Sequence, residues 1–127
     1  MLVNDINYHL PALFFKRGDG EMIPATTPTF IIKLKNADNY IRDSVNIKVY
    51  IRQQDVLLVK EMKDLVIDAE NNSIGITLTQ KESSKFLYKK GNIEFQVHGL
   101  LLDNETAWKT YVVETPVDKT LTKDLIQ

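Results

Sequence analysis

The sequence predicts an all-β protein, more specifically an immunoglobulin-like antiparallel β-sandwich with one short crossover helix at about residues 80–88. Three observations favour this fold class. Short segments of alternating apolar and polar residues recur along the chain, turn clusters separate them roughly every 8–12 residues, and one compact helix signal lies among them. A length of 127 residues predicts a single domain, 1–127, with residues 1–16 as a candidate N-terminal arm and 117–127 as a candidate C-terminal tail.

The first strands are predicted on either side of Pro11. Tyr8 and Leu10 alternate with polar neighbours before the proline, and Phe14 and Phe15 follow it. Because proline cannot donate to a sheet ladder, we expect it at an edge or a bend of one or two short strands. Of the two adjacent phenylalanines, one is expected in the core and the other in a subunit contact or partly exposed.

The clearest strand patterns follow. The segment 29–35 is expected to bury one face, formed by Phe30, Ile32 and Leu34. The segment 44–53 alternates most regularly of all, and its expected inward-facing residues are Val45, Ile47, Val49 and Ile51. Gln54 and Asp55 then predict a tight turn into a strand at 56–61, and therefore a hairpin, before another short strand at 65–67.

A helix signal lies between two further strands. The flanking strands alternate through Ile74, Ile76 and Leu78 on one side and through Ile93, Phe95 and Val97 on the other. Thr79 and Glu82 match a capping box, and the residues at 89–91, Lys-Lys-Gly, are typical of a helix end. Since so short a helix is marginal alone, we expect Phe86 and Leu87 to hold it on the sheet as a strand-to-strand crossover.

A last hairpin is predicted from the turn at 103–106 and the strand at 107–114, which Pro116 interrupts or ends. Trp108 is expected in the core of this hairpin. The alternative is a sugar-stacking site formed by Trp108 and Tyr111, as in a carbohydrate-binding module that uses exposed aromatic rings. The apolar residues of the tail could add an edge strand or dock on a neighbour: Leu121, Leu125 and Ile126.

Composition excludes several functions. The 16 Lys and Arg nearly balance the 17 Asp and Glu, so no nucleic-acid partner is expected. No cysteine occurs, and His9 and His98 are too few for a histidine-based zinc site, so we expect no disulfide, metal or cofactor. No apolar run approaches the roughly 20 residues that span a membrane, and no signal peptide is recognised. No catalytic constellation stands out, and we expect a protein that is made and folded in a cytoplasm.

The order of these segments resembles a known family. The strand 45–51 ends in Arg-Gln-Gln, the motif Leu-Thr-Gln-x-Glu occupies 78–82, Ile-x-Phe-Gln-Val occupies 93–97, and the chain closes with 107–110 and 121–126. This layout, which spans roughly 14–126, is similar to that of small virion proteins of phages and prophages of Gram-positive bacteria. It resembles the N-terminal domain of baseplate upper proteins in particular.

The resemblance implies a structural role in a phage particle rather than a reaction. A baseplate or tail adaptor, a capsid decoration and a head-fibre base all fit it. The expected partners are other virion proteins and further copies of the chain, in a homo-oligomer for which a trimer is plausible. We expect the contacts at the two chain ends and at exposed strand edges. The candidate interface residues are Tyr8, Leu10, Phe14, Phe15, Leu121, Leu125 and Ile126.

Overall fold

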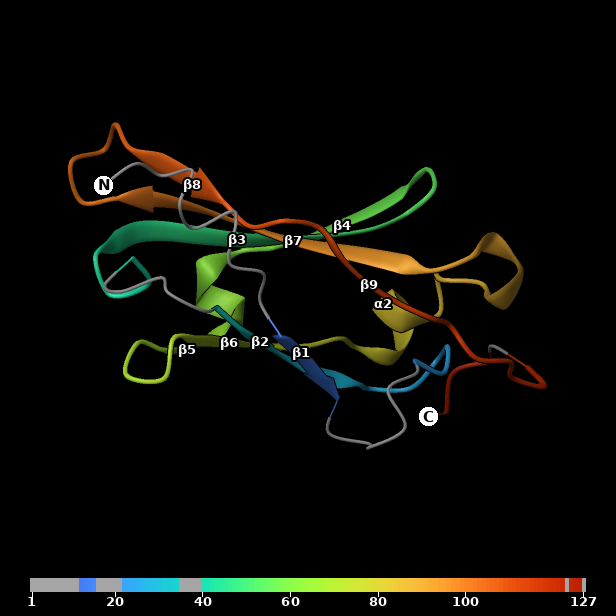
Figure 1. Cartoon of the computed structure of the whole chain (residues 1–127). Coiled ribbons are helices and arrows are strands. Elements are labelled where there is room, and N and C mark those ends of the chain that lie inside the picture. Colours follow the sequence, from blue (N-terminus) through green and yellow to red (C-terminus); the bar gives the residue numbers. More distant parts are fainter. Residues whose placement is uncertain (1–11, 16–21, 35–39, 123, 127) are drawn as a thin grey trace.

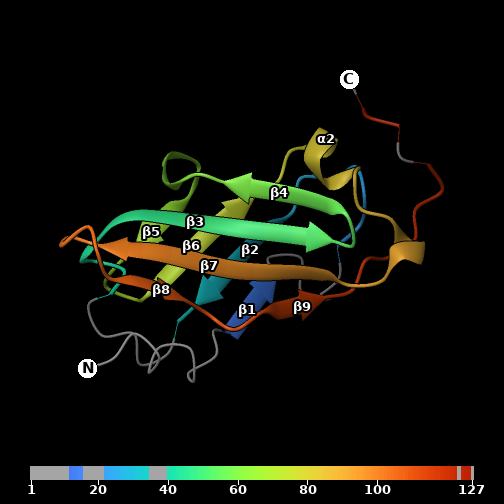
Figure 2. The same ribbon diagram turned by 90° about the horizontal axis from the view of Figure 1, so that it is seen from above.

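The computed structural model describes residues 12–15, 22–34, 40–122 and 124–126, the first of these ranges by its backbone alone. Two antiparallel sheets face one another, and the strands of one cross those of the other obliquely (Figures 1 and 2). The four-stranded sheet has the order β1 (Ala12–Phe15), β2 (Thr29–Lys33), β6 (Ser73–Thr77) and β5 (Val66–Asp68). The five-stranded sheet contains β4 (Val56–Lys60), β3 (Ser44–Gln53), β7 (Ile93–Leu101), β8 (Ala107–Lys109) and β9 (Val113–Thr115).

The chain passes between the sheets three times after β2, and short helical segments lie on two of these passages. The β3–β4 hairpin leads through the 3-10 turn η1 (Met62–Asp64) to β5 and β6. The helix α2 (Gln80–Ser83) and the 3-10 turn η2 (Tyr88–Lys90) then carry the chain back to β7. Both β8 and β9 pair with β7, so that β4 forms the opposite edge of the five-stranded sheet.

The core lies between the sheets and confirms the predicted alternation. Phe30 on β2 meets Phe95 on β7 with ring centroids 4.9 Å apart, which joins the two layers at their centre. Burying such side chains is the main favourable term in folding, at about 25 cal/mol per Å² of apolar surface. The predicted inward residues that are buried are Phe30, Ile32, Leu34, Ile47, Val49, Ile51, Ile74, Ile76, Leu78, Ile93, Phe95 and Val97.

Val45 departs from the prediction, because its side chain is 41% exposed. Ser44 pairs with Leu101 and Asn46 with Leu100, so Val45 is an extra residue, a β-bulge, on β3. The bulge turns the hydroxyl of Ser44 inward, where it accepts a hydrogen bond from Trp108 Nε1 at 3.0 Å. Alternation alone predicts the opposite directions for residues 44 and 45, since it assumes an unbroken pleat.

The predicted helix at 80–88 is wrong in its extent, although its start is confirmed. Thr79 Oγ1 accepts from the Glu82 N–H at 3.1 Å, and Glu82 Oε1 accepts from the Thr79 N–H at 2.9 Å, which forms the expected capping box. The α-helix nevertheless ends at Ser83, and Leu87 has an extended backbone with φ −119°. Phe86 turns into the core, whereas Leu87 is only half-buried, so Phe86 alone is the fully buried plug of the crossover.

A buried glutamine explains why the helix does not continue. Gln53 Oε1 accepts from the Leu87 N–H at 2.8 Å, while Gln53 Nε2 donates to the carbonyls of Leu87 and Gly91 at 2.7 and 2.8 Å. The amide therefore occupies the N–H that another helical turn would use and pairs three backbone groups at once. The side chain is 2% exposed, and every polar atom of this amide has a partner.

The last predicted strand, 107–114, divides into β8 and β9 on either side of Thr110. Thr110 Oγ1 accepts from the Val97 N–H at 3.1 Å, so a side chain replaces one step of the backbone ladder. β9 ends at Thr115, directly before Pro116, as predicted. A parallel bridge between Met22 and Val117 then ties the chain ahead of β2 to the start of the tail.

The contact between Glu82 and Lys60 leads to a prediction for acid stability. Burial alone would raise the pKa of the Glu82 carboxyl, but hydrogen bonds from Lys60, at 2.8 Å, and from Thr79 outweigh it and lower this pKa. A lowered folded-state pKa stabilises the protein above the ordinary glutamate pKa, and the contribution is lost as the pH falls through the folded value. We expect Glu82→Gln to remove about 1 kcal/mol of this acid-sensitive stability.

Urea unfolding at several pH values from neutral to acid tests this contribution. The difference in unfolding free energy between the natural chain and Glu82→Gln should shrink toward low pH, because both side chains are then uncharged. A difference that stays constant with pH would contradict the assignment. Gln at this position still accepts from the Thr79 N–H, so the variant isolates the ion pair from the capping box.

Candidate interaction surface

Most exposed large apolar side chains of the described residues lie at the periphery of the five-stranded sheet and on the tail. Leu57 and Val59 project from the edge strand β4, and they are 54% and 39% exposed. The sequence already carried a signal for them, because the run Val-Leu-Leu-Val at 56–59 does not alternate and so places apolar side chains on both faces of the strand. The remaining exposed residues of this kind are Val45, Val66, Tyr88, Leu102, Tyr111, Val112, Leu121, Leu125 and Ile126.

A shallow hollow of about 230 Å³ lies beside Leu57 on the outer side of the five-stranded sheet. At its base the rings of Tyr50 and His98 are 4.2 Å apart between centroids. Gln96 Nε2 donates to the Thr110 carbonyl at 2.8 Å, which leaves Gln96 Oε1 to accept from His98 Nε2, also at 2.8 Å. The hollow is lined by Tyr50, Arg52, Leu57, Glu94, Phe95, Gln96, His98 and Val112.

The charges in this hollow are balanced. Burial, followed by the nearby charge of Lys109, lowers the pKa of His98, so its imidazole is neutral at pH 7. Arg52 Nη2 and Nε lie 3.0 and 3.1 Å from Glu94 Oε1. Arg52 and Glu94 thus offset each other's charge, Gln96 and His98 bond to one another, and the lining also contains the apolar Leu57 and Val112.

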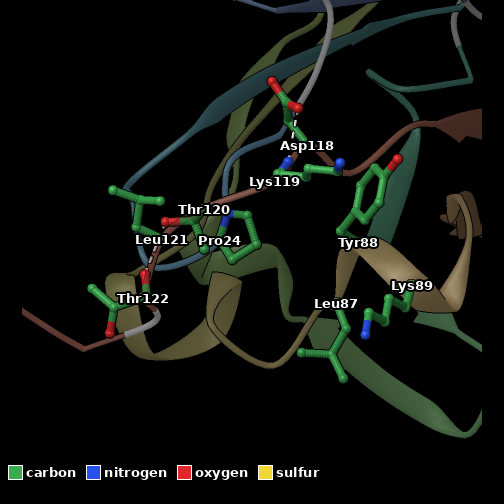
Figure 3. A pocket seen from close by; sticks show the side chains of 9 residues that line it. All are labelled: Pro24, Leu87, Tyr88, Lys89, Asp118, Lys119, Thr120, Leu121 and Thr122. Atoms are coloured by element: carbon green, nitrogen blue, oxygen red, sulfur yellow. Dashed lines mark hydrogen bonds between the residues drawn. The ribbon is translucent and has the colours of Figure 1, made fainter.

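A larger hollow, of about 500 Å³, lies between η2 and the tail (Figure 3). Its apolar walls come from Pro24, Leu87 and Leu121, and Lys119 Nζ lies 5.1 Å from the centroid of the Tyr88 ring. That distance permits a cation–π contact between the tail and the crossover segment. The lining contains neither histidine nor carboxylate pairs, and it suits contact with an apolar or aromatic side chain more than proton transfer. Its residues are Pro24, Leu87, Tyr88, Lys89, Asp118, Lys119, Thr120, Leu121 and Thr122.

The tail is held at one further point by a side chain rather than by a strand. Gln80 Nε2 donates to the Ile126 carbonyl at 3.0 Å, and Gln80 Oε1 accepts from the Ile126 N–H at 2.8 Å. The side chains of Leu121 and Ile126 remain almost fully exposed, and Leu125 is 38% exposed. Among its described residues, the tail forms no strand on either sheet, so the edge strand that the sequence allowed is not seen there.

The other predicted interface residues lie at the N-terminus. Tyr8 and Leu10 are outside the described residues. Phe14 and Phe15 belong to the edge strand β1, where their backbones pair with Ile31 and with Phe30, respectively. The structure therefore places the two phenylalanines on a sheet edge, and their role in an interface stays a prediction.

Of the two aromatic residues in the sugar-stacking alternative, one is buried and the other is exposed. Trp108 is 1% exposed, and its Nε1–H is used within the core by Ser44 Oγ. The indole thus has no free face for a sugar, and the core position expected for Trp108 is the one observed. Tyr111 is exposed, but without Trp108 the proposed pair of stacking rings does not exist.

Neither a metal site nor a membrane-spanning helix is found among the described residues. In the part of the chain that the structure describes, no three His, Cys, Asp or Glu side chains gather where they could hold a metal ion. Within the same residues, no helix has the length and apolar character needed to cross a membrane. No protein-family model matches the chain, and no curated protein is significantly similar to it.

Proposed function

We propose that the two sheets form an immunoglobulin-like β-sandwich. In constant-type immunoglobulin domains, strands A, B, E and D form one sheet in the order ABED, and C, F and G form the other. If β1 is taken as strand A, the order β1-β2-β6-β5 corresponds to ABED, and β3-β7-β8 corresponds to CFG. β4 then takes the place of the additional strand C′ found in variable-type domains.

The centre of the core supports this assignment. Antibody domains join strands B and F with a disulfide across the two sheets. In the proposed correspondence these strands are β2 and β7, which are joined here by the contact between Phe30 and Phe95. A chain without cysteine, folded in a reducing compartment, would need such an apolar replacement.

We further propose that the protein is a non-enzymatic structural component of a bacteriophage particle that acts through protein–protein contacts. The observation that carries this proposal is the apolar surface away from the core, on β4 and on the tail at Leu121 and Ile126. Exposed apolar side chains and free strand edges are typical of contact surfaces. The segment order that resembles baseplate upper proteins gives the kind of assembly. A baseplate or tail adaptor, a capsid decoration and a head-fibre base all fit that resemblance.

Detection of the chain in purified particles tests the proposed role. Particles induced from a strain that carries the gene would be separated on a density gradient and probed with antibodies raised against this chain. We expect the chain to sediment with the particles, and immunogold label at the tail end would favour the baseplate or tail role. Label on the head would favour the capsid roles, and absence from the particles, with the chain present in the cell lysate, would refute a virion role.

A further inference from the structure

We propose that the protein forms a twofold dimer by antiparallel pairing of β4 with the β4 strand of a second copy. The proposal deepens the self-association contained in the proposed function and rests on that function only to this extent. Figure 2 shows β4 at the rim of the five-stranded sheet, with β3 on its inner side. Of the edge strands whose side chains are described, β4 is the longest, at five residues.

The hairpin register determines which backbone groups of β4 point away from its own sheet. Gln53 pairs with Val56 across a two-residue turn, and residues flanking such a turn exchange both hydrogen bonds. The pairing then alternates, so Leu58 also bonds to β3, whereas Leu57 and Val59 direct their N–H and C=O groups outward. These outward N–H and C=O groups of Leu57 and Val59 are the unpaired backbone groups to which an added strand can bond.

This edge is complementary to itself. A twofold axis through Leu58 places Leu57 of one copy opposite Val59 of the other, and each such pair exchanges two backbone hydrogen bonds, as hydrogen-bonded antiparallel pairs do. The same axis sets the exposed Leu57 and Val59 side chains beside each other on the outer face, apolar against apolar. Registers shifted by two residues are also twofold, but each keeps only one apolar pair and opposes Val59 with Asp55 or Leu57 with Glu61, so the side chains favour the register whose axis passes through Leu58.

Charge does not protect this edge as it protects many others. Natural edge strands are often blocked by an exposed lysine. The only lysine of β4, Lys60, has an 11% exposed side chain, and its Nζ lies 2.8 Å from Glu82 Oε1. A net charge of −1 adds little repulsion between copies. Beyond the paired residues, Asp55 would approach Glu61 of the other copy, so we expect the dimer to strengthen when salt screens this repulsion.

Single cysteines test the register directly, because the natural chain has none. Leu58 of one copy would lie opposite Leu58 of the other in a non-hydrogen-bonded pair. The two Cα atoms of such a pair are about 4.5 Å apart, a distance that a disulfide can join. We expect Leu58→Cys to form a covalent dimer on mild oxidation. The matched control is Val66→Cys on β5, the edge of the other sheet, which should form no disulfide-linked dimer under the same conditions. No disulfide dimer from a folded Leu58→Cys chain would contradict this register.

Light scattering and sedimentation of the unmodified chain over a range of concentrations test the dimer itself. Leu57→Pro removes an outward N–H and the leucine side chain without removing a hydrogen bond to β3, and Val59→Lys places a charge on an exposed position. Each should raise the dimer dissociation constant at least about tenfold. Val66→Lys should leave it unchanged, and circular dichroism and thermal unfolding would establish that all variants fold. The proposal is refuted if the natural chain stays monomeric at every concentration, or if the folded Val59→Lys variant still dimerises as before. Either result leaves the virion test unaffected, so the two proposals fail separately.

Discussion

Replacing Gln53 with leucine is expected to cost about 3 kcal/mol of unfolding free energy, because three hydrogen bonds disappear together. Leucine has nearly the same size, so the change removes polar partners without opening a cavity. The Leu87 N–H and the carbonyls of Leu87 and Gly91 would then lose the partner that holds the crossover against β3. Urea unfolding measures the loss, and the backbone amide of Leu87 should also exchange its hydrogen much faster.

Two further variants separate this role from a general effect of the hairpin end. Gln54→Ala removes a single bond of 3.1 Å from an exposed side chain to the Lys90 carbonyl, and it should cost less than about 0.5 kcal/mol. Gln53→Glu keeps the shape but places an oxygen opposite two carbonyl oxygens. Its carboxyl should have a raised pKa in the folded state, so its stability relative to the natural chain should fall as the pH rises. Similar losses for Gln53→Leu and Gln54→Ala would contradict the assignment of a three-bond anchor.

Replacing Gly99 with alanine is expected to cost at least about 3 kcal/mol, because Trp108 already occupies the space above this glycine. A β-carbon at Gly99 would overlap three atoms of the indole, Cε2, Cζ2 and Nε1. The ring would have to move, and with it the bond from Trp108 Nε1 to Ser44 Oγ. Thermal and urea unfolding measure the effect, and the near-ultraviolet signal of this single tryptophan reports whether the ring has shifted.

Gly75 offers a matched control in the other sheet. A β-carbon there would meet Val66 Cβ at 3.3 Å, a tight contact with an exposed side chain that has room to move. Gly75→Ala should therefore change stability by less than about 1 kcal/mol. In a double-mutant cycle, Trp108→Leu should recover part of the loss caused by Gly99→Ala, since it removes the ring that causes the overlap. If Gly99→Ala and Gly75→Ala cost the same, the close approach of Trp108 is not the cause.

Features that depend on residues close together in the chain were predictable, and features that depend on residues far apart were not. Strand faces, the Gln54–Asp55 turn and the capping box of Thr79 and Glu82 were predictable, because each depends on neighbours within a few positions of the chain. The exposed apolar side chains of β4 could also have been predicted, because the apolar run at 56–59 does not alternate as the residues of β3 do. What local patterns cannot reveal is which sheet each strand joins, as the division of β4 and β5 between two sheets illustrates.

Local sequence patterns establish an all-β chain of short strands with one capped helical turn, because side-chain alternation and capping depend on neighbouring residues. Long-range contacts set the length of that helix, the bulge at Val45 and the surroundings of Trp108. Gln53 ends the helix from 34 positions away, and Ser44 meets the indole across 64 positions. These long-range hydrogen bonds satisfy polar groups that folding buries, and their energetic cost when unpaired outweighs the local preference of a helix turn or an unbroken strand.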